Sequence, residues 1–291
     1  MTSKAFVAAL ALCGLSVAAC GGAVNGTTAD PARHGEPASP AASPVASPAA
    51  SQATRVAATA TPAPSAGRSV PAGPLRGKVV VIDPGHNGLN YRYPSKINKL
   101  VDVLTQRKAC DTTGTATDSG YSEAAFTWDV SQRLAKILKA RGATVKLTRT
   151  DNSGVGPCIT QRAAIGNKAK ADAAISIHAD GAPAAGHGFH VIMPKKIGGP
   201  VDPVVGQSRE LGIDVRNSVR SVAGLPYSTY IGNKALDFRD DLGGLNLSTV
   251  PKVFIESGNM RNPGDAAKFR SPAFRQKLAL GIADGMQTYL K

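Results

Sequence analysis

The stretch VVVIDPGHNG, residues 79–88, joins an apolar run directly to a histidine. The four β-branched residues from Val79 to Ile82 have the composition of a strand that is buried on both faces. A proline and a glycine in the DPGH motif then interrupt the run. We therefore predict a buried strand that ends abruptly and places His86 at its C-terminal tip.

Two further apolar runs end in a polar side chain in the same way. ADAAISIHAD, residues 171–180, places His178 at a strand exit, and KVFIESGNM, residues 252–260, does the same for Glu256. Glu123 begins a predicted helix soon after a glycine. In open α/β sheets, ligands bind beyond the carboxyl ends of the strands. The sequence therefore predicts that these side chains meet His86 at one edge of a sheet.

Short apolar runs alternate with segments of helical periodicity throughout the C-terminal three quarters of the chain. The predicted strands are 79–82, 144–147, 173–177, 189–193 and 253–255, and the predicted helices are 124–140, 159–169, 203–222 and 272–290. This alternation predicts an α/β layer fold around one sheet. A domain spanning residues 75–291 is large enough to bury a full core.

The N-terminal quarter has the composition of an export signal and a linker. Residues 1–19 carry one lysine followed by a small and apolar run, which is typical of a secretory signal peptide. Residues 20–74 are rich in Ala, Ser, Thr and Pro and contain no aromatic residue, so we predict a disordered linker. The protein is therefore expected to be exported to the cell envelope.

The cysteines suggest a lipid anchor and a disulfide. VAACGG, residues 17–22, resembles a bacterial lipobox in which Cys20 is lipidated, while ordinary signal cleavage would leave Cys20 as a free thiol. The lipobox interpretation is favoured because Cys13 leaves with the signal peptide and lipidation of Cys20 leaves an even pair. That pair, Cys110 and Cys158, is most simply a disulfide in an oxidising compartment.

The chain is strongly basic, with a net charge of +14. This charge fits either an anionic partner, such as an acidic envelope polymer or a membrane surface, or simply a soluble basic surface. The single Trp and the lack of interleaved aromatic and basic residues do not favour nucleic acid. We expect no nucleic-acid partner, a monomer, and membrane contact only through the lipid anchor.

Two imidazoles and one carboxylate are a ligand set for catalytic zinc, with a fourth position open to water. Zinc lowers the pKa of that water from 15.7 to about 7, and a second carboxylate can take and return the proton. A single histidine after a strand is more often structural, and the chain has no HExxH-type motif. His187 and His190 flank a glycine and are expected to be structural or surface residues, and His34 lies in the linker.

Several motifs in this order resemble the zinc-dependent N-acetylmuramoyl-L-alanine amidases of bacterial cell-wall turnover. They are VVIDPGH with His86, YSEAAFTWDVSQRLAKIL with Glu123, GATVKLTRTD, QRAAIGNKAKADAAISIHAD with His178, and PKVFIESGNMRNPGD with Glu256. The resemblance covers residues 77–291 and implies a single domain with a mixed central sheet packed between helices.

The resemblance also implies the roles of four residues. His86, Glu123 and His178 would bind one zinc ion at the C-terminal ends of the strands, and Glu256 would be the catalytic carboxylate. The substrate would be the peptidoglycan amide between N-acetylmuramic acid and the L-alanine of the stem peptide. A zinc peptidase acting on wall peptides, or a non-catalytic peptidoglycan-binding module, would be the alternatives.

The chain departs from the family pattern in three places. Asn87 stands where a second glycine is usual, and the family usually has an apolar or aromatic residue near the position of Asn259. Residues 90–120, between two of the implied zinc ligands, form a longer segment than the family commonly has. We interpret this inserted segment as a loop beside the active site, held by a disulfide between Cys110 and Cys158.

Overall fold

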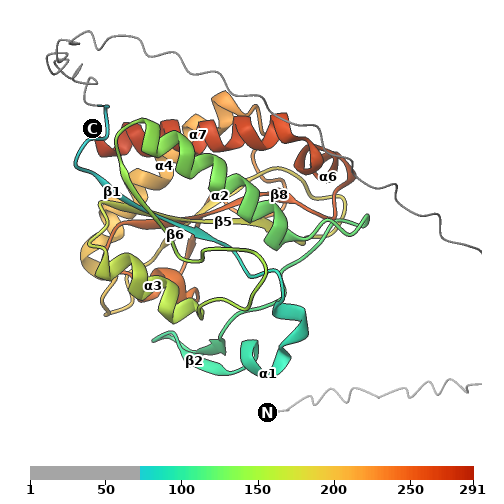
Figure 1. Cartoon of the computed structure of the whole chain (residues 1–291), viewed down its shortest axis with the longest axis horizontal. Coiled ribbons are helices and arrows are strands. Elements are labelled where there is room, and N and C mark those ends of the chain that lie inside the picture. The colour runs from blue at the N-terminus through green and yellow to red at the C-terminus, as the bar shows by residue number, and fades with distance from the viewer. Residues whose placement is uncertain (1–72) are drawn as a thin grey trace, which may run out of the picture. The chain divides into compact units, whose positions relative to one another are not determined.

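The computed structural model describes residues 73–291 (Figure 1). The predicted signal peptide, Cys20 and the predicted linker up to residue 72 lie outside the described residues. Among the helices of residues 73–291, none combines the length and the apolar character needed to cross a membrane.

A six-stranded sheet lies at the centre of the domain, in the order β4-β1-β5-β8-β6-β7. Its strands are β1 (Val79–Pro84), β4 (Thr144–Leu147), β5 (Ala173–Asp180), β6 (His190–Pro194), β7 (Leu236–Arg239) and β8 (Lys252–Asn259). Strands β4, β1, β5 and β8 are parallel, whereas β6 runs antiparallel to β8 and parallel to β7. The predicted mixed sheet is confirmed.

Helices cover both faces of this sheet (Figure 1). One face packs against α2 (Glu123–Ala140), α4 (Val205–Val222) and α7 (Pro272–Leu290), and the other carries α3 (Ile159–Lys168) and α5 (Gly243–Asn246). A short helix, α6 (Pro263–Arg270), connects β8 to α7, and a 3₁₀ turn, η2 (Asp202–Val204), precedes α4. The predicted packing of a sheet between helices is therefore also confirmed.

Strand β1 has apolar side chains on both faces of the sheet, so both faces must be covered by helices. Val80 and Ile82 point into the large core beneath α2, α4 and α7, while Val81 belongs to a smaller cluster on the α3 side. All three side chains are almost completely buried. Burial on both faces explains why the sequence of β1 is a continuous apolar run and not an alternating one.

Helix α2 begins at Glu123, as predicted for that residue, one position before the apolar pattern of residues 124–140. Ser122 is the N-cap, and its hydroxyl accepts a hydrogen bond from the N–H of Ala125 at 3.3 Å. Glu123 is therefore the first residue of the helix, and its charge is favoured there by the helix dipole. After the helix, Gly142 adopts a positive φ of 94°, which suits a glycine that ends a helix.

The structure extends several strands beyond their apolar runs and adds elements that the sequence pattern does not predict. Strands β5 and β8 continue into polar residues because these still pair with each other in the ladder. The inserted segment contains η1 (Asn90–Arg92), α1 (Pro94–Ile97) and a hairpin of β2 (Leu100–Asp102) with β3 (Arg107–Ala109). Strand β7 was also not predicted.

Candidate active site

Three elements bring the predicted metal ligands together. His86 follows β1 directly, His178 lies on the neighbouring strand β5, and Glu123 begins α2. Each of these residues offers one ligand atom within 4.8 Å of the others. They are the only group of this kind among residues 73–291.

The two histidines face the carboxylate through defined ring atoms. His86 Nε2 lies 3.2 Å from Glu123 Oε2, and His178 Nδ1 lies 2.9 Å from Glu123 Oε1. The two rings stand nearly perpendicular, with their centroids 5.0 Å apart. Two imidazole nitrogens and one carboxylate oxygen form the donor set that suits zinc.

Backbone amides fix the Glu123 carboxylate. Oε1 accepts a hydrogen bond from the N–H of Ala179 at 3.2 Å, and Oε2 accepts one from the N–H of Thr115 at 2.9 Å. Burial raises the pKa of Glu123, but His86 and His178 outweigh it and lower the pKa below its ordinary value. The carboxylate is therefore ionised and oriented toward both rings.

His86 is held in a protonated form by its acidic neighbours. Burial lowers its pKa, but Glu123 and Asp111 outweigh this effect and raise the pKa to about 10. A cation that binds between these side chains would replace this proton as the counter-charge to Glu123. Metal uptake at this site would therefore be coupled to proton release.

Glu256 lies on β8 in register with His178 on β5. It lines a cavity of about 300 Å³ together with all three residues of the cluster. Its Oε2 is buried and has no hydrogen-bond partner among the described residues. Burial raises its pKa well above the ordinary value, and Glu123 and Asp180 act in the same direction. A carboxyl group in this state is suited to take and return a proton during a reaction.

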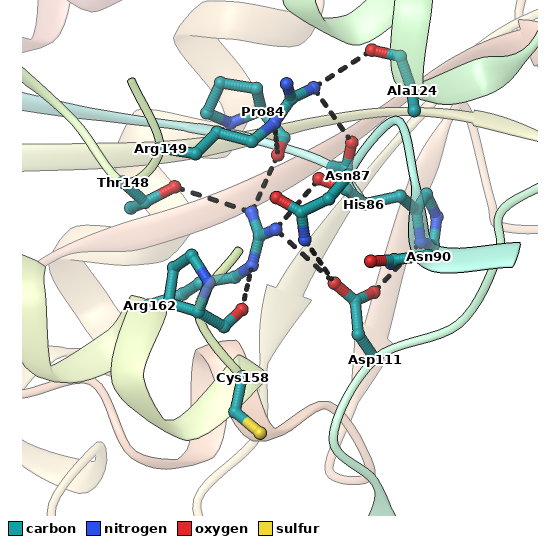
Figure 2. A network of polar contacts seen from close by, with 12 residues as sticks. Pro84, His86, Asn87, Asn90, Asp111, Ala124, Thr148, Arg149, Cys158 and Arg162 are labelled. Atoms are coloured by element: carbon teal, nitrogen blue, oxygen red, sulfur yellow. Dashed lines mark hydrogen bonds and ion pairs between the residues drawn. The ribbon is translucent and has the colours of Figure 1, made fainter. Parts of the chain in front are cut away.

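Two arginines hold the backbone that carries His86 (Figure 2). Arg162 donates to the carbonyls of Pro84 at 2.7 Å and His86 at 2.9 Å. Arg149 donates to the carbonyls of Pro84 at 3.2 Å and Ala124 at 2.9 Å. His86 itself has a left-handed φ of 56°, a conformation that persists only when the surroundings hold it.

Asp83 lies buried beneath this turn and ties it to the sheet. Its carboxylate pairs with Arg162 at 2.8 Å and with Lys252 at 3.0 Å. It also accepts hydrogen bonds from the hydroxyls of Thr148 and Ser176 at 2.6 Å each. Burial raises its pKa, but the two cations and the hydroxyls bring the pKa well below the ordinary value. The group is a structural anion behind the cluster.

The structure contains a disulfide between Cys110 and Cys158, the pair that the sequence indicated. The bond joins the inserted segment to the residue that immediately precedes α3. The inserted segment therefore lies beside the cluster, as interpreted from the sequence, and it contributes Thr112, Gly114 and Thr115 to the cavity wall.

Sequence reasoning did not find several residues of the site. Asp111 and Arg162 contact the His86 turn, and Thr115 contacts Glu123. His190, expected to be a structural or surface residue, is 1% exposed and pairs in register with Glu256, which agrees with the structural alternative. The one available signal was the position of Asp111, directly after a cysteine expected to be bridged beside the active site.

Comparison with known proteins identifies the family. The sequence pattern of the N-acetylmuramoyl-L-alanine amidase family matches residues 80–288. An N-acetylmuramoyl-L-alanine amidase of Mycobacterium tuberculosis is 39% identical over 235 residues, covering 80% of this chain and 94% of that relative. The chain belongs to the N-acetylmuramoyl-L-alanine amidase family. It is accordingly an enzyme of the amidase class, as the motifs predicted.

Solved structures of this amidase family share the fold. The crystal structure of the amidase Ami1 from Mycobacterium smegmatis is 39% identical, with a TM-score of 0.70, over 74% of this chain and 98% of that one. Ami1 from Mycobacterium abscessus is 44% identical, with a TM-score of 0.70, over 74% of this chain and 100% of that one. The similarity therefore extends over almost the whole of these amidases.

Proposed function

We propose that the protein is a zinc-dependent N-acetylmuramoyl-L-alanine amidase. It would hydrolyse the amide between N-acetylmuramic acid and the L-alanine of the stem peptide in peptidoglycan. One observation carries this proposal: in a chain of this family, the ligand atoms of His86, Glu123 and His178 lie within 4.8 Å of one another. Glu256 adds a free carboxyl group on the wall of the same cavity.

The residues of the cluster fit zinc by their chemistry. Three protein ligands, two of them imidazoles, are the number and type that catalytic zinc sites use. Glu123 is ionised, and each of its oxygens faces one histidine nitrogen. The buried negative charge needs a cation, which the proton on His86 supplies when no metal is bound.

Bound zinc would supply Lewis-acid polarisation of the scissile carbonyl and acidification of the attacking water. Glu256 would take a proton from the water while the water oxygen attacks the lactyl carbonyl carbon. The carbon–nitrogen bond then breaks, and Glu256 would return the proton to the departing amine of L-alanine. The products are a free muramic acid carboxyl group and a stem peptide with a free N-terminus.

The unpartnered oxygen of Glu256 supports this role. A buried carboxyl oxygen without a protein partner costs free energy unless another molecule contacts it. A water or amine in the cavity can satisfy it. Burial, Glu123 and Asp180 raise the pKa of Glu256, which makes it a stronger base toward the water and lets it hold the proton until the amine departs.

Digestion of purified muropeptides tests the proposal, with mass spectrometry of the fragments before and after treatment with a zinc chelator. An amidase releases intact stem peptides and peptide-free glycan, and the chelator stops the release. Cleavage inside the stem peptide would instead identify a peptidase. Binding without cleavage would identify a wall-binding module.

We also propose an exported, monomeric protein with a signal peptide at residues 1–19 and a lipid anchor at Cys20. The linker predicted for residues 20–74 would let the enzyme reach peptidoglycan from the membrane. The motif around Cys20 and the cysteine count support the anchor. The cell-wall chemistry of the family agrees with export.

A further inference from the structure

The ring of His86 has a second nitrogen, which faces away from the cluster. His86 Nδ1 lies 3.1 Å from Asp111 Oδ1. Thr112 also contacts this nitrogen, through its carbonyl oxygen at 3.2 Å and its hydroxyl at 3.2 Å. Asp111 is only 6% exposed. An acidic side chain of the inserted segment therefore backs the ring of the first proposed ligand.

Asp111 is itself held by several donors. Its Oδ2 accepts hydrogen bonds from Asn87 Nδ2 at 3.0 Å and from Arg162 Nη2 at 3.4 Å. Its Oδ1 accepts one from the N–H of Thr112 at 2.8 Å. Figure 2 shows the carboxylate of Asp111 facing both the guanidinium of Arg162 and the ring of His86. These contacts leave the carboxylate little freedom to turn away from His86.

The disulfide holds the backbone of Asp111 at the same place. Cys110, which directly precedes Asp111, is bonded to Cys158 at the start of α3. The carbonyl of Cys110 also accepts a hydrogen bond from the N–H of Ile159 at 2.9 Å. Because α3 carries Arg162, the same helix end fixes both the main chain and the side chain of Asp111.

A second proposed ligand depends on the same segment. Thr115 donates its N–H to Glu123 Oε2 at 2.9 Å, and its carbonyl accepts the N–H of Glu123 at 2.9 Å. Residues 111–115 therefore contact His86 and Glu123 from behind, whereas His178 receives no such contact from them.

We propose that Asp111 is a positioning residue for the metal centre, held in place by the Cys110–Cys158 disulfide. Asp111 accepts the Nδ1 proton of His86 and so leaves the lone pair of His86 at Nε2, the atom that faces Glu123. The proposal rests on the metal centre of the proposed function and assigns a new role to the inserted segment.

Hydrogen-bond partners of metal ligands change affinity measurably. A carboxylate behind a histidine fixes its tautomer and orientation and makes it a more basic ligand, and loss of such a partner typically costs 10- to 100-fold in metal affinity. In this protein Thr112 offers a carbonyl to the same nitrogen. Removal of Asp111 should therefore weaken zinc binding by about tenfold, at the lower end of that range.

The test is the zinc Kd of the full chain, measured by competition with a chromophoric chelator. Asp111→Ala should raise the Kd about tenfold. Asp111→Asn keeps an acceptor oxygen but loses the charge, so its zinc Kd should lie between that of the wild type and that of Asp111→Ala. Thr113→Ala, whose hydroxyl contacts only the carbonyl of Gly114 among the described residues, is the matched control and should keep the wild-type Kd.

The visible spectrum of bound Co²⁺ separates positioning from general stability. The spectrum should change in Asp111→Ala, because the His86 ring is then held less firmly, and stay unchanged in Thr113→Ala. The double variant Cys110→Ser with Cys158→Ser should raise the zinc Kd less than Asp111→Ala does, since Asn87 and Arg162 still hold the carboxylate.

The outcomes distinguish this proposal from the proposed function. Wild-type protein that binds no zinc would overturn the metal centre, and the role of Asp111 with it. Tight wild-type binding, with an unchanged Kd and Co²⁺ spectrum in Asp111→Ala, would overturn only the role of Asp111. If the alanine variant does not fold, the same result in Asp111→Asn overturns it. A wild-type Kd in the double serine variant would overturn the role of the disulfide.

Discussion

The edge of the central sheet and the inserted segment contact the same cluster from two sides, and they are built differently. The sheet edge presents His178 and Glu256 on adjacent paired strands whose apolar residues are buried on both faces. The inserted segment has only short helices and a two-stranded hairpin, and it is fastened by one disulfide and a few polar contacts. We expect the sheet edge to supply the reacting groups and the inserted segment to orient the ligands.

The largest effect is expected on the sheet side. Glu256→Gln keeps the size of the side chain and removes the base, so kcat should fall 10²- to 10⁴-fold. The loss should appear mainly in kcat, because the proton moves only in the chemical steps. Muropeptide kinetics measure it. Zinc content, determined on the same sample, should stay near that of the wild type.

Glu123→Gln is the matched comparison for Glu256→Gln. Because Glu123 faces both histidines, its variant should lose zinc as well as turnover. If Glu256→Gln lost zinc while Glu123→Gln kept it, the two glutamates would have to exchange roles. Wild-type turnover in Glu256→Gln would refute the mechanism.

Arg162 joins the two sides, because it pairs with Asp83 behind the sheet edge and with Asp111 of the inserted segment. Arg162→Ala should lower the free energy of unfolding by about 3–5 kcal/mol, since it leaves buried carboxylates without their partner. Urea unfolding measures this change. The control variant Arg133→Ala, which removes a partly exposed pair with Asp129, should cost less than about 1 kcal/mol. Equal losses of unfolding free energy in the two variants would show that the buried contacts of Arg162 stabilise the protein no more than the Arg133 pair does.

The stability of the chelator-treated protein should depend on pH through Glu256. Folding raises the pKa of this carboxyl above its ordinary value of 4.5 by burial and by Glu123 and Asp180. The folded state therefore binds the proton more tightly, so stability is complete below that value and falls as the pH rises toward the raised pKa. Each pKa unit of this shift corresponds to about 1.4 kcal/mol.

Glu256→Gln cannot lose this proton, so its stability should fall less than that of the wild type between pH 5 and pH 8. Urea unfolding of both proteins at the two pH values measures the difference. Parallel pH profiles would contradict the raised pKa of Glu256.

The smallest effect on catalysis is expected from a change outside both regions. Cys20→Ser should move the protein from the membrane fraction to the soluble fraction and leave the muropeptide turnover of the domain unchanged. A flexible chain of about 55 residues averages roughly 40 Å from end to end, so the predicted linker would set how far from the membrane the domain can act. Wild-type protein that is already soluble would show that the signal is a simple secretory one.

The two regions also differ in how much of them could be predicted from the sequence. The sheet edge was predictable because continuous apolar runs mark buried strands, and each run leads directly to His86, His178 or Glu256. The order of parallel strands then brings their ends to one edge. The four-residue strand β7 has no such run, so its position as the outermost strand beside β6 was not predicted.

The contacts of the inserted segment were not predictable in the same way. Asp111 meets His86 from 25 positions away, and Arg162 meets Asp83 from 79 positions away. No periodicity links such residues, because polar contacts between loops depend on how the whole chain folds. The cysteines were the exception. In an exported protein with a lipidated Cys20, Cys110 and Cys158 were the only two cysteines left to form a disulfide.

The zinc content of His178→Ala, measured beside that of Asp111→Ala after saturation with zinc and removal of the unbound metal, tests the division of roles most directly. We expect about one equivalent in the wild type, most of it lost in His178→Ala, and most of it kept in Asp111→Ala with a raised Kd. Full retention of zinc in His178→Ala would contradict the assignment of the ligands to the sheet edge.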